Sequence, residues 1–198
     1  MTYGSPEFDW DVLTRPDVAS LLAGQLGFSW LDLHEHLQDL ADDEYFWKPA
    51  PWALSIAPRS KTSRRTAGAG ERVVEWPDGP DDPGPRTIAW LVSHLVEVFA
   101  ERWEWTFGGR TRRRDDIVLA HPSAEDGVAA LAEAVGAWQE GIAALTEDEL
   151  WTVGRSQATP VDQQAPFAHL VLHLNRELIH HGAEIAVLRD LYRASSAA

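Results

Sequence analysis

The stretch PFAHLVLHLNRELIHHGAEIAVLRDLY, residues 166–192, decides the fold. Its leucines, valines and isoleucines recur at three- and four-residue steps, which is the spacing of side chains along one face of an α-helix. Almost every side of that helix is apolar, and an apolar circumference is typical of a helix buried among others. The segment also carries four of the chain's eight histidines within thirteen residues. It therefore predicts both a core helix and a place for chemistry.

Three further helices are predicted at residues 16–40, 87–107 and 123–145. Pro16 suits the first turn of a helix because its ring fixes φ at a helical value. Thr87 is a candidate N-cap, and Gly108 is a suitable residue just beyond a helix end. Ser123 has an acidic residue three positions later, which resembles a capping box. Four amphipathic helices with long connections predict an all-α four-helix bundle formed by one domain, residues 1–198.

The longest connection, residues 42–86, is rich in proline and glycine and shows no clear alternating strand pattern. Its first part, EYFWKPAPWALSI at residues 44–56, is aromatic enough to pack on the helices. Its later parts, SKTSRRTAGAG and PDGPDDPGP, are predicted to form a mobile loop. Connections of this length in compact domains are usually functional or disordered.

Composition excludes several classes of function. The chain has no cysteine, so disulfides, thiolate metal sites and cysteine nucleophiles are excluded, and any metal must be held by His, Asp or Glu. A formal charge of −14 disfavours a nucleic-acid partner, which needs a basic footprint. No apolar run is long enough to span a membrane, and the N-terminal residues do not resemble a signal peptide. We expect a cytoplasmic protein, and its ten tryptophans suit an apolar patch for a homodimer.

A helical wheel of residues 166–192 places His181 in the apolar sector and Glu177 at the edge of that sector. The two residues are four positions apart, so their side chains can converge on one ion. His94 lies in the middle of residues 87–107, with Leu91, Leu95 and Val98 on its own face, so its ring should face the core too. These three residues form a candidate metal site. The alternative for each of them alone is a hydrogen-bonded core histidine or a buried ion pair.

The remaining histidines are assigned by their positions on the same wheel. His173 lies one turn before Glu177 and is a candidate for a fourth ligand or a nearby base. His180 belongs to the surface or the rim of the site. His34, His36 and His121 are predicted to be ordinary surface residues.

The chain resembles the DinB-like superfamily of four-helix bundles, which includes thiol-dependent maleylpyruvate isomerases of mycothiol-using bacteria. Three segments carry the resemblance: EYFWKPAPWALSI, TIAWLVSHLVEV and NRELIHHGAEIAVLRDLY. The resemblance implies a divalent metal, zinc or nickel, held by the histidine of the second segment and by an i, i+4 pair on the last helix. One register of that pair gives Glu177 and His181. The others give Arg176 and His180, or His173 and His180, and arginine cannot be a ligand.

The resemblance also implies an activity. A metal held by three protein ligands has open positions and can activate a bound thiol or water. We therefore expect an enzyme that activates a low-molecular-weight thiol such as mycothiol, as a transferase or isomerase acting on a small-molecule substrate. Aromatic residues at Phe46, Trp47 and Trp52, with Trp151, are candidates for the walls of its pocket or, alternatively, for core packing. The alternative function is a non-catalytic, ligand-binding or stress-related bundle whose metal is structural or absent.

Overall fold

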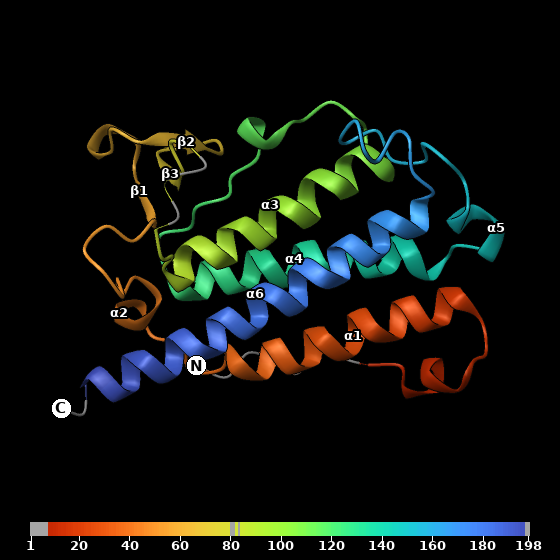
Figure 1. Ribbon diagram of the computed structural model, residues 1–198, viewed down its shortest axis with the longest axis horizontal. Coiled ribbons are helices and arrows are strands. Elements are labelled where there is room, and N and C mark those ends of the chain that lie inside the picture. Colours follow the sequence, from red (N-terminus) through yellow and green to blue (C-terminus); the bar gives the residue numbers. More distant parts are fainter. Residues whose placement is uncertain (1–7, 80–81, 83, 197–198) are drawn as a thin grey trace.

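Four long helices lie side by side in the computed structural model, which describes residues 8–79, 82 and 84–196 (Figure 1). They are α1 (Val18–His36), α3 (Ile88–Thr106), α4 (Ala124–Ala143) and α6 (Phe167–Ser196). The shorter elements are η1 (Trp10–Thr14), α2 (Asp42–Tyr45), η2 (Arg59–Lys61), η3 (Arg114–Asp116) and α5 (Glu147–Leu150), together with strands β1 (Ile56–Pro58), β2 (Arg65–Ala67) and β3 (Arg72–Trp76). The described chain is thus mostly helical, as the periodicity predicts. None of its helices has the length and apolarity needed to cross a membrane.

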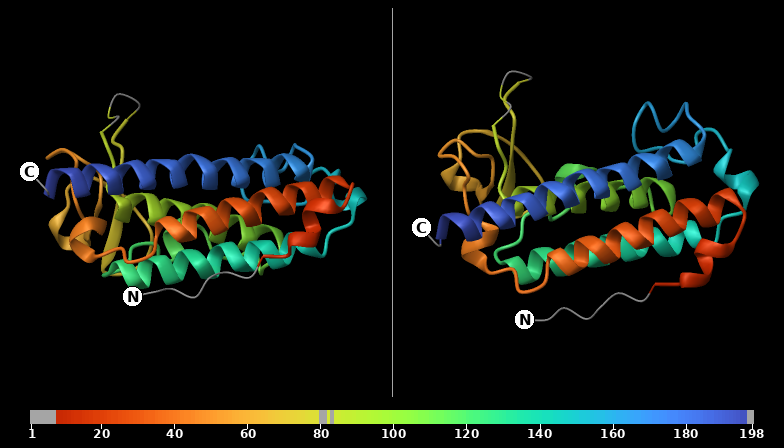
Figure 2. Two further views of the ribbon diagram at one scale, coloured as in Figure 1. Left: turned by 90° about the horizontal axis from the view of Figure 1, so that it is seen from below. Right: turned by 60° about the horizontal axis from the view of Figure 1, so that its bottom comes forward.

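The long helices form two pairs (Figures 1 and 2). The helices within each pair are parallel, and the two pairs are antiparallel to each other. Helices α1 and α6 run one way, and α3 and α4 run the other way. The connection between α3 and α4 returns along the length of α3, so that α4 starts at the same end as α3. Helix α3 packs against α4 and α6, and α1 packs against α6 and α4. The α3–α6 contact, which joins antiparallel neighbours, is the one that positions the candidate site.

The N-caps show which sequence signals set the helix boundaries. Thr87 accepts a hydrogen bond from the backbone N–H of Trp90, and Ser123 accepts one from that of Asp126, as predicted. The first helix is shorter than predicted because Asp17 is its N-cap, accepting from Ser20, so Pro16 lies outside the helix. That helix ends at His36, and the predicted last turn as far as residue 40 is not helical.

The prediction of a strandless connection over residues 42–86 is wrong. The strands form an antiparallel sheet in the order β1–β3–β2, with Ile56 opposite Val74 and Ala67 opposite Val74 on the other side. The segment SKTSRRTAGAG, predicted to be mobile, supplies β2, and Ala67 is buried. Strands of three to five residues are too short to show the alternation that identifies a strand. The segment PDGPDDPGP lies partly outside the described residues.

The core combines the long helices with the first part of this connection. Tyr45 and Leu54 are fully buried, as expected for a docked segment, whereas Trp52 is exposed. One histidine assignment is wrong: His34 is buried, and its ring lies edge-on to Trp30 in the core. The sequence does not reveal this burial, because His34 is followed directly by two polar residues, Glu35 and His36, which favour a surface position.

Candidate metal centre

Three of the predicted site residues come together where α3 crosses α6. His94 lies in the second turn of α3, and Glu177 and His181 lie one turn apart on α6. Their ligand-type atoms are within 4.8 Å of one another. His181 is buried, while the side chains of His94 and Glu177 are each 17% exposed. The group is therefore held by the core but stays within reach of solvent.

The distances within the group suit a bound cation better than plain ion pairs. The Nε2 atoms of His94 and His181 lie 3.5 and 3.4 Å from the same oxygen, Oε2 of Glu177. A charge-assisted N–H···O bond is typically about 2.7–2.9 Å long, so both contacts are long for hydrogen bonds. Two ligand atoms at about 2.0–2.2 Å from a tetrahedral zinc ion lie about 3.3–3.6 Å apart. The residues present thus fit a small divalent cation.

Each imidazole is oriented from behind by a carboxylate. The Nδ1 atom of His94 lies 3.1 Å from Oε2 of Glu97, and Nδ1 of His181 lies 3.2 Å from Oε2 of Glu184. A carboxylate can only accept, so Nδ1 carries the proton and Nε2 of each ring faces Glu177. This is the arrangement by which metal-binding histidines are commonly held. Both pairs follow an HxxE spacing, HLVE at 94–97 and HGAE at 181–184, which is the sequence signal for these two carboxylates.

The small sheet supplies one side of the site. Trp90 stacks on His94 with ring centroids 5.1 Å apart, and its indole N–H donates to the backbone carbonyl of Glu75 next to β3 residue Trp76. The ring centroid of Trp76 lies 6.0 Å from that of His94. The guanidinium of Arg86 lies over Trp90, and that of Arg114 lies over Trp76. Sheet and α3 together therefore hold the His94 ring in place and form an aromatic wall beside it.

The charges in the group stabilise one another. The nearby imidazoles of His181 and His94 hold the pKa of Glu177 far below its usual range, despite burial that acts in the other direction. Burial by itself lowers the pKa of His94, but the contacts with Glu177 and Glu97 outweigh it, and the pKa lies above its ordinary value. The pKa of His181 is raised in the same way by Glu177 and Glu184. Without a metal the site is therefore an ionised carboxylate between two proton-binding rings.

The other sequence candidates lie outside this group. His173 contacts the second oxygen of Glu177 at 3.6 Å and accepts a hydrogen bond from Arg176 at 2.6 Å. His180 is exposed and belongs to a second group, with His181 and Glu184, whose ligand-type atoms lie within 4.8 Å of one another. Trp151 follows α5, near the start of α6. Phe46 and Trp47 pack against the hydrophobic core, which is the alternative given for them above. The wall-forming tryptophans, Trp76 and Trp90, were not singled out by sequence reasoning.

The protein is thus a mostly helical chain in which two histidines and one carboxylate converge between two long helices. The sequence model of one protein family, described as the DinB superfamily, matches residues 25–185. The match covers most of the chain, and the chain belongs to the DinB superfamily. No curated protein and no solved structure matches it.

Proposed function

We propose that this chain is a metal-dependent enzyme built on the family's four-helix bundle, with one divalent ion, zinc or nickel, held by His94, Glu177 and His181. The observation that carries the proposal is the convergence of both Nε2 atoms on one oxygen of Glu177 at 3.4–3.5 Å. Two additional carboxylates, Glu97 and Glu184, fix the rings in the tautomer that a metal ligand needs. Membership of the DinB superfamily, which is associated with divalent metals, supports the same site.

Three protein ligands are the number found in catalytic zinc sites, which keep a position open for water or substrate. The partial exposure of His94 and Glu177 supports access to that position from solvent. A divalent cation there would lower the pKa of a coordinated thiol or water, which makes it a nucleophile at neutral pH. The acceptors around the group, Glu97 and Glu184, would keep the two rings positioned as this happens.

We propose a low-molecular-weight thiol such as mycothiol as the co-substrate, in a transfer or isomerisation reaction on a small molecule. The chain has no cysteine, so a thiol nucleophile must come from outside the protein. Trp76 and Trp90 offer apolar ring faces next to His94, against which the body of such a substrate can pack. The arginines over these rings, Arg86 and Arg114, suit polar or charged substituents.

Metal analysis of untagged protein tests the site. The wild type and His180→Ala should carry about one equivalent of zinc or nickel, and His181→Ala should carry almost none. His180→Ala is the matched control, because His180 is the adjacent residue on the same helix and is exposed. Metal at background level in the wild type after incubation with zinc or nickel, or equal loading of both variants, would contradict the assignment.

Turnover separates the enzyme from the non-catalytic alternative. The metal-loaded wild type should accelerate the reaction of mycothiol with a thiol-reactive fluorogenic probe such as monobromobimane, and His94→Ala should not. If metal loading is normal and no thiol tested is activated, the metal is structural and the proposed activity fails while the metal site stands. Thermal melting of each variant confirms that it is folded.

A further inference from the structure

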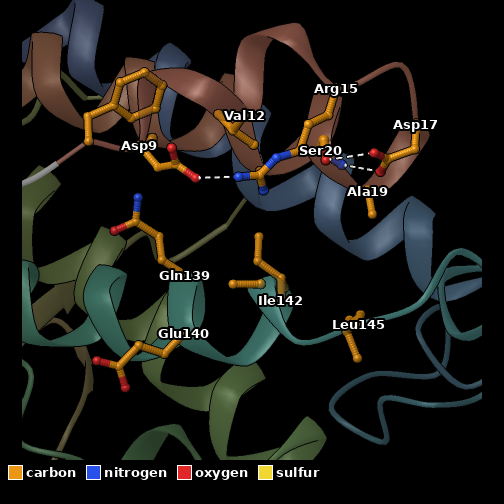
Figure 3. A pocket seen from close by; sticks show the side chains of 14 residues that line it. Asp9, Val12, Arg15, Asp17, Ala19, Ser20, Gln139, Glu140, Ile142 and Leu145 are labelled. Carbon is orange, nitrogen blue, oxygen red and sulfur yellow. Dashed lines mark hydrogen bonds and ion pairs between the residues drawn. The ribbon is translucent and has the colours of Figure 1, made fainter.

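A second candidate site lies between helices α1 and α4. A cavity of about 390 Å³ opens between α1 and α4, and Phe8, Asp9 and η1 cover one side of it (Figure 3). This volume lies in the range of small-molecule sites, about 300–1,000 Å³. The candidate metal centre belongs to α3 and α6, so neither its ligands nor their orienting carboxylates line this cavity.

Most of the cavity surface is apolar. Ala19, Ala23 and Gly27 follow one another at one-turn intervals on α1, and the ring of Phe8 packs directly against Gly27. Val12 of η1 and Ile142 of α4 face each other across it (Figure 3). A ligand that fills this space must therefore present an apolar group to these walls.

The polar end of the cavity is an ion pair. A terminal nitrogen of Arg15 donates to Oδ2 of Asp9 at 2.9 Å, and the pair lies across the opening (Figure 3). Their side chains are 52% and 59% exposed, so the pair contributes little to stability and both charges can exchange partners cheaply. Gln139 extends toward the same place and has no hydrogen-bond partner among the described residues.

The other acidic groups at the rim are not available to a ligand. Asp17 already caps α1, accepting from the backbone N–H and the hydroxyl of Ser20 at 2.8 Å each. Glu140 points away from the cavity (Figure 3). Asp9 also caps η1, where its Oδ1 accepts from the backbone N–H of Asp11 at 3.1 Å, so the groups that can meet a ligand are its Oδ2, the Arg15 guanidinium and the Gln139 amide.

We propose that this cavity binds a small zwitterion with an apolar side group, of the size and chemistry of an aliphatic amino acid. The ligand carboxylate takes the place of Asp9 on Arg15 and accepts from the Gln139 amide, and the ligand ammonium pairs with Asp9. A ligand with one charge would engage only one member of this pair, whereas a zwitterion engages both. A net-neutral ligand also avoids repulsion by a chain of charge −14.

Titration calorimetry on the full chain tests the proposal with leucine and three of its fragments. Isocaproate keeps the carboxylate and side chain, isoamylamine keeps the ammonium and side chain, and glycine keeps only the two charges. Leucine should bind at least about tenfold more tightly than each fragment, because only leucine engages both charges and the apolar walls. The absence of leucine binding at millimolar concentration, or equal affinity for all four probes, overturns the proposal.

Two variants locate the binding. Arg15→Met should weaken leucine binding at least about tenfold, whereas Arg65→Met, an exposed arginine on β2 in the distant sheet, should bind as the wild type does. Ala23→Leu should abolish binding by filling the cavity, and a melting temperature no lower than that of the wild type shows that it folds. Unchanged leucine affinity in Arg15→Met or in folded Ala23→Leu would show that the ligand binds elsewhere.

Discussion

Each imidazole of the candidate metal centre depends on a residue three positions further along its own helix. Glu97 serves His94, and Glu184 serves His181. Glu97 is the more buried of the two carboxylates, so water replaces its contact less easily. The inward orientation of the three candidate residues, His94, Glu177 and His181, could be predicted from the sequence, because helical periodicity placed each of them on or beside the apolar face of its helix. The long-range pairing of His94 with Glu177 could not, since it depends on how α3 crosses α6.

Replacing Glu97 with glutamine should weaken metal binding while leaving all three ligands in place. We expect about a tenfold loss of zinc affinity, because the ring loses its charged acceptor and the basicity this gives to Nε2. Competition with a chromophoric chelator measures the affinity. Glu133→Gln, an exposed glutamate on α4, is the control and should bind zinc as the wild type does. Equal affinities of the two variants would contradict an orienting role for Glu97.

A different carboxylate, that of Glu104, should make the stability of the fold depend on pH. Glu104 is buried at the end of α3 and accepts from the backbone N–H of Thr111 at 2.9 Å, from its hydroxyl and from Arg112. The backbone hydrogen bond from Thr111 is the main reason why the pKa of Glu104 lies below its usual value. The stabilisation is therefore present above the ordinary carboxyl pKa and is lost as the pH falls through the lower folded value.

Glu104→Gln should accordingly cost about 1 kcal/mol of unfolding free energy at neutral pH, where the wild-type carboxylate is charged. The difference between the two proteins should shrink toward zero as the pH is lowered below the ordinary carboxyl range. Urea unfolding of metal-free protein at a series of pH values measures it. A difference that grows with acidity would mean that the pKa of Glu104 is raised in the folded chain.

At the scale of elements, one arginine ties the last helix to the connection after α1. Arg189 of α6 binds both carboxylate oxygens of Glu44 in α2, at 2.8 and 3.0 Å, and also donates to the backbone carbonyls of His36 and Gln38. Both side chains of the pair are at most 6% exposed. Because α2 precedes the sheet that carries Trp76, this ion pair contributes to the placement of the site wall.

Arg189→Met should destabilise the protein by about 3–5 kcal/mol, because it leaves the buried Glu44 carboxylate with only the exposed Arg193, whose Nε lies 3.9 Å away. The double variant Arg189→Met/Glu44→Leu should recover part of the loss, since it removes the uncompensated charge as well. Urea unfolding of the wild type, both single variants and the double variant forms the cycle that measures this coupling. A double variant less stable than Arg189→Met would show that the charge of Glu44 is satisfied in some other way.

The helices were predictable as elements and the sheet was not. Ile88–Thr106 and Ala124–Ala143 match their predicted ranges closely, because N-caps and apolar periodicity are local signals. The strands β1, β2 and β3 are short and are stabilised by pairing with each other and by burial of Val73 and Val74. Pairing partners seven to eighteen residues apart in the chain leave no local mark that distinguishes such short strands from a loop.

At the scale of the whole molecule, a bound metal would connect α3 to α6 and so couple binding to folding. Zinc at about one hundred times its dissociation constant should stabilise the folded chain by about 2.7 kcal/mol, and excess chelator should remove that gain. Thermal melting with zinc and with chelator measures the effect. His94→Ala should show no zinc-dependent shift, and an equal shift in this variant would place the bound zinc elsewhere.

The sequence by itself determined the helical character of the chain, the inward-facing His94, Glu177 and His181, and the absence of any thiol. These follow from composition and from the period of the α-helix, which are properties of single segments. Only the tertiary structure decided that the ligand atoms meet, that Glu97 and Glu184 lie behind the rings, and that Trp76 and Trp90 flank them. The cavity between α1 and α4 likewise exists only after packing. Such features depend on the distances between segments far apart in the chain, and helix crossing and sheet docking set those distances.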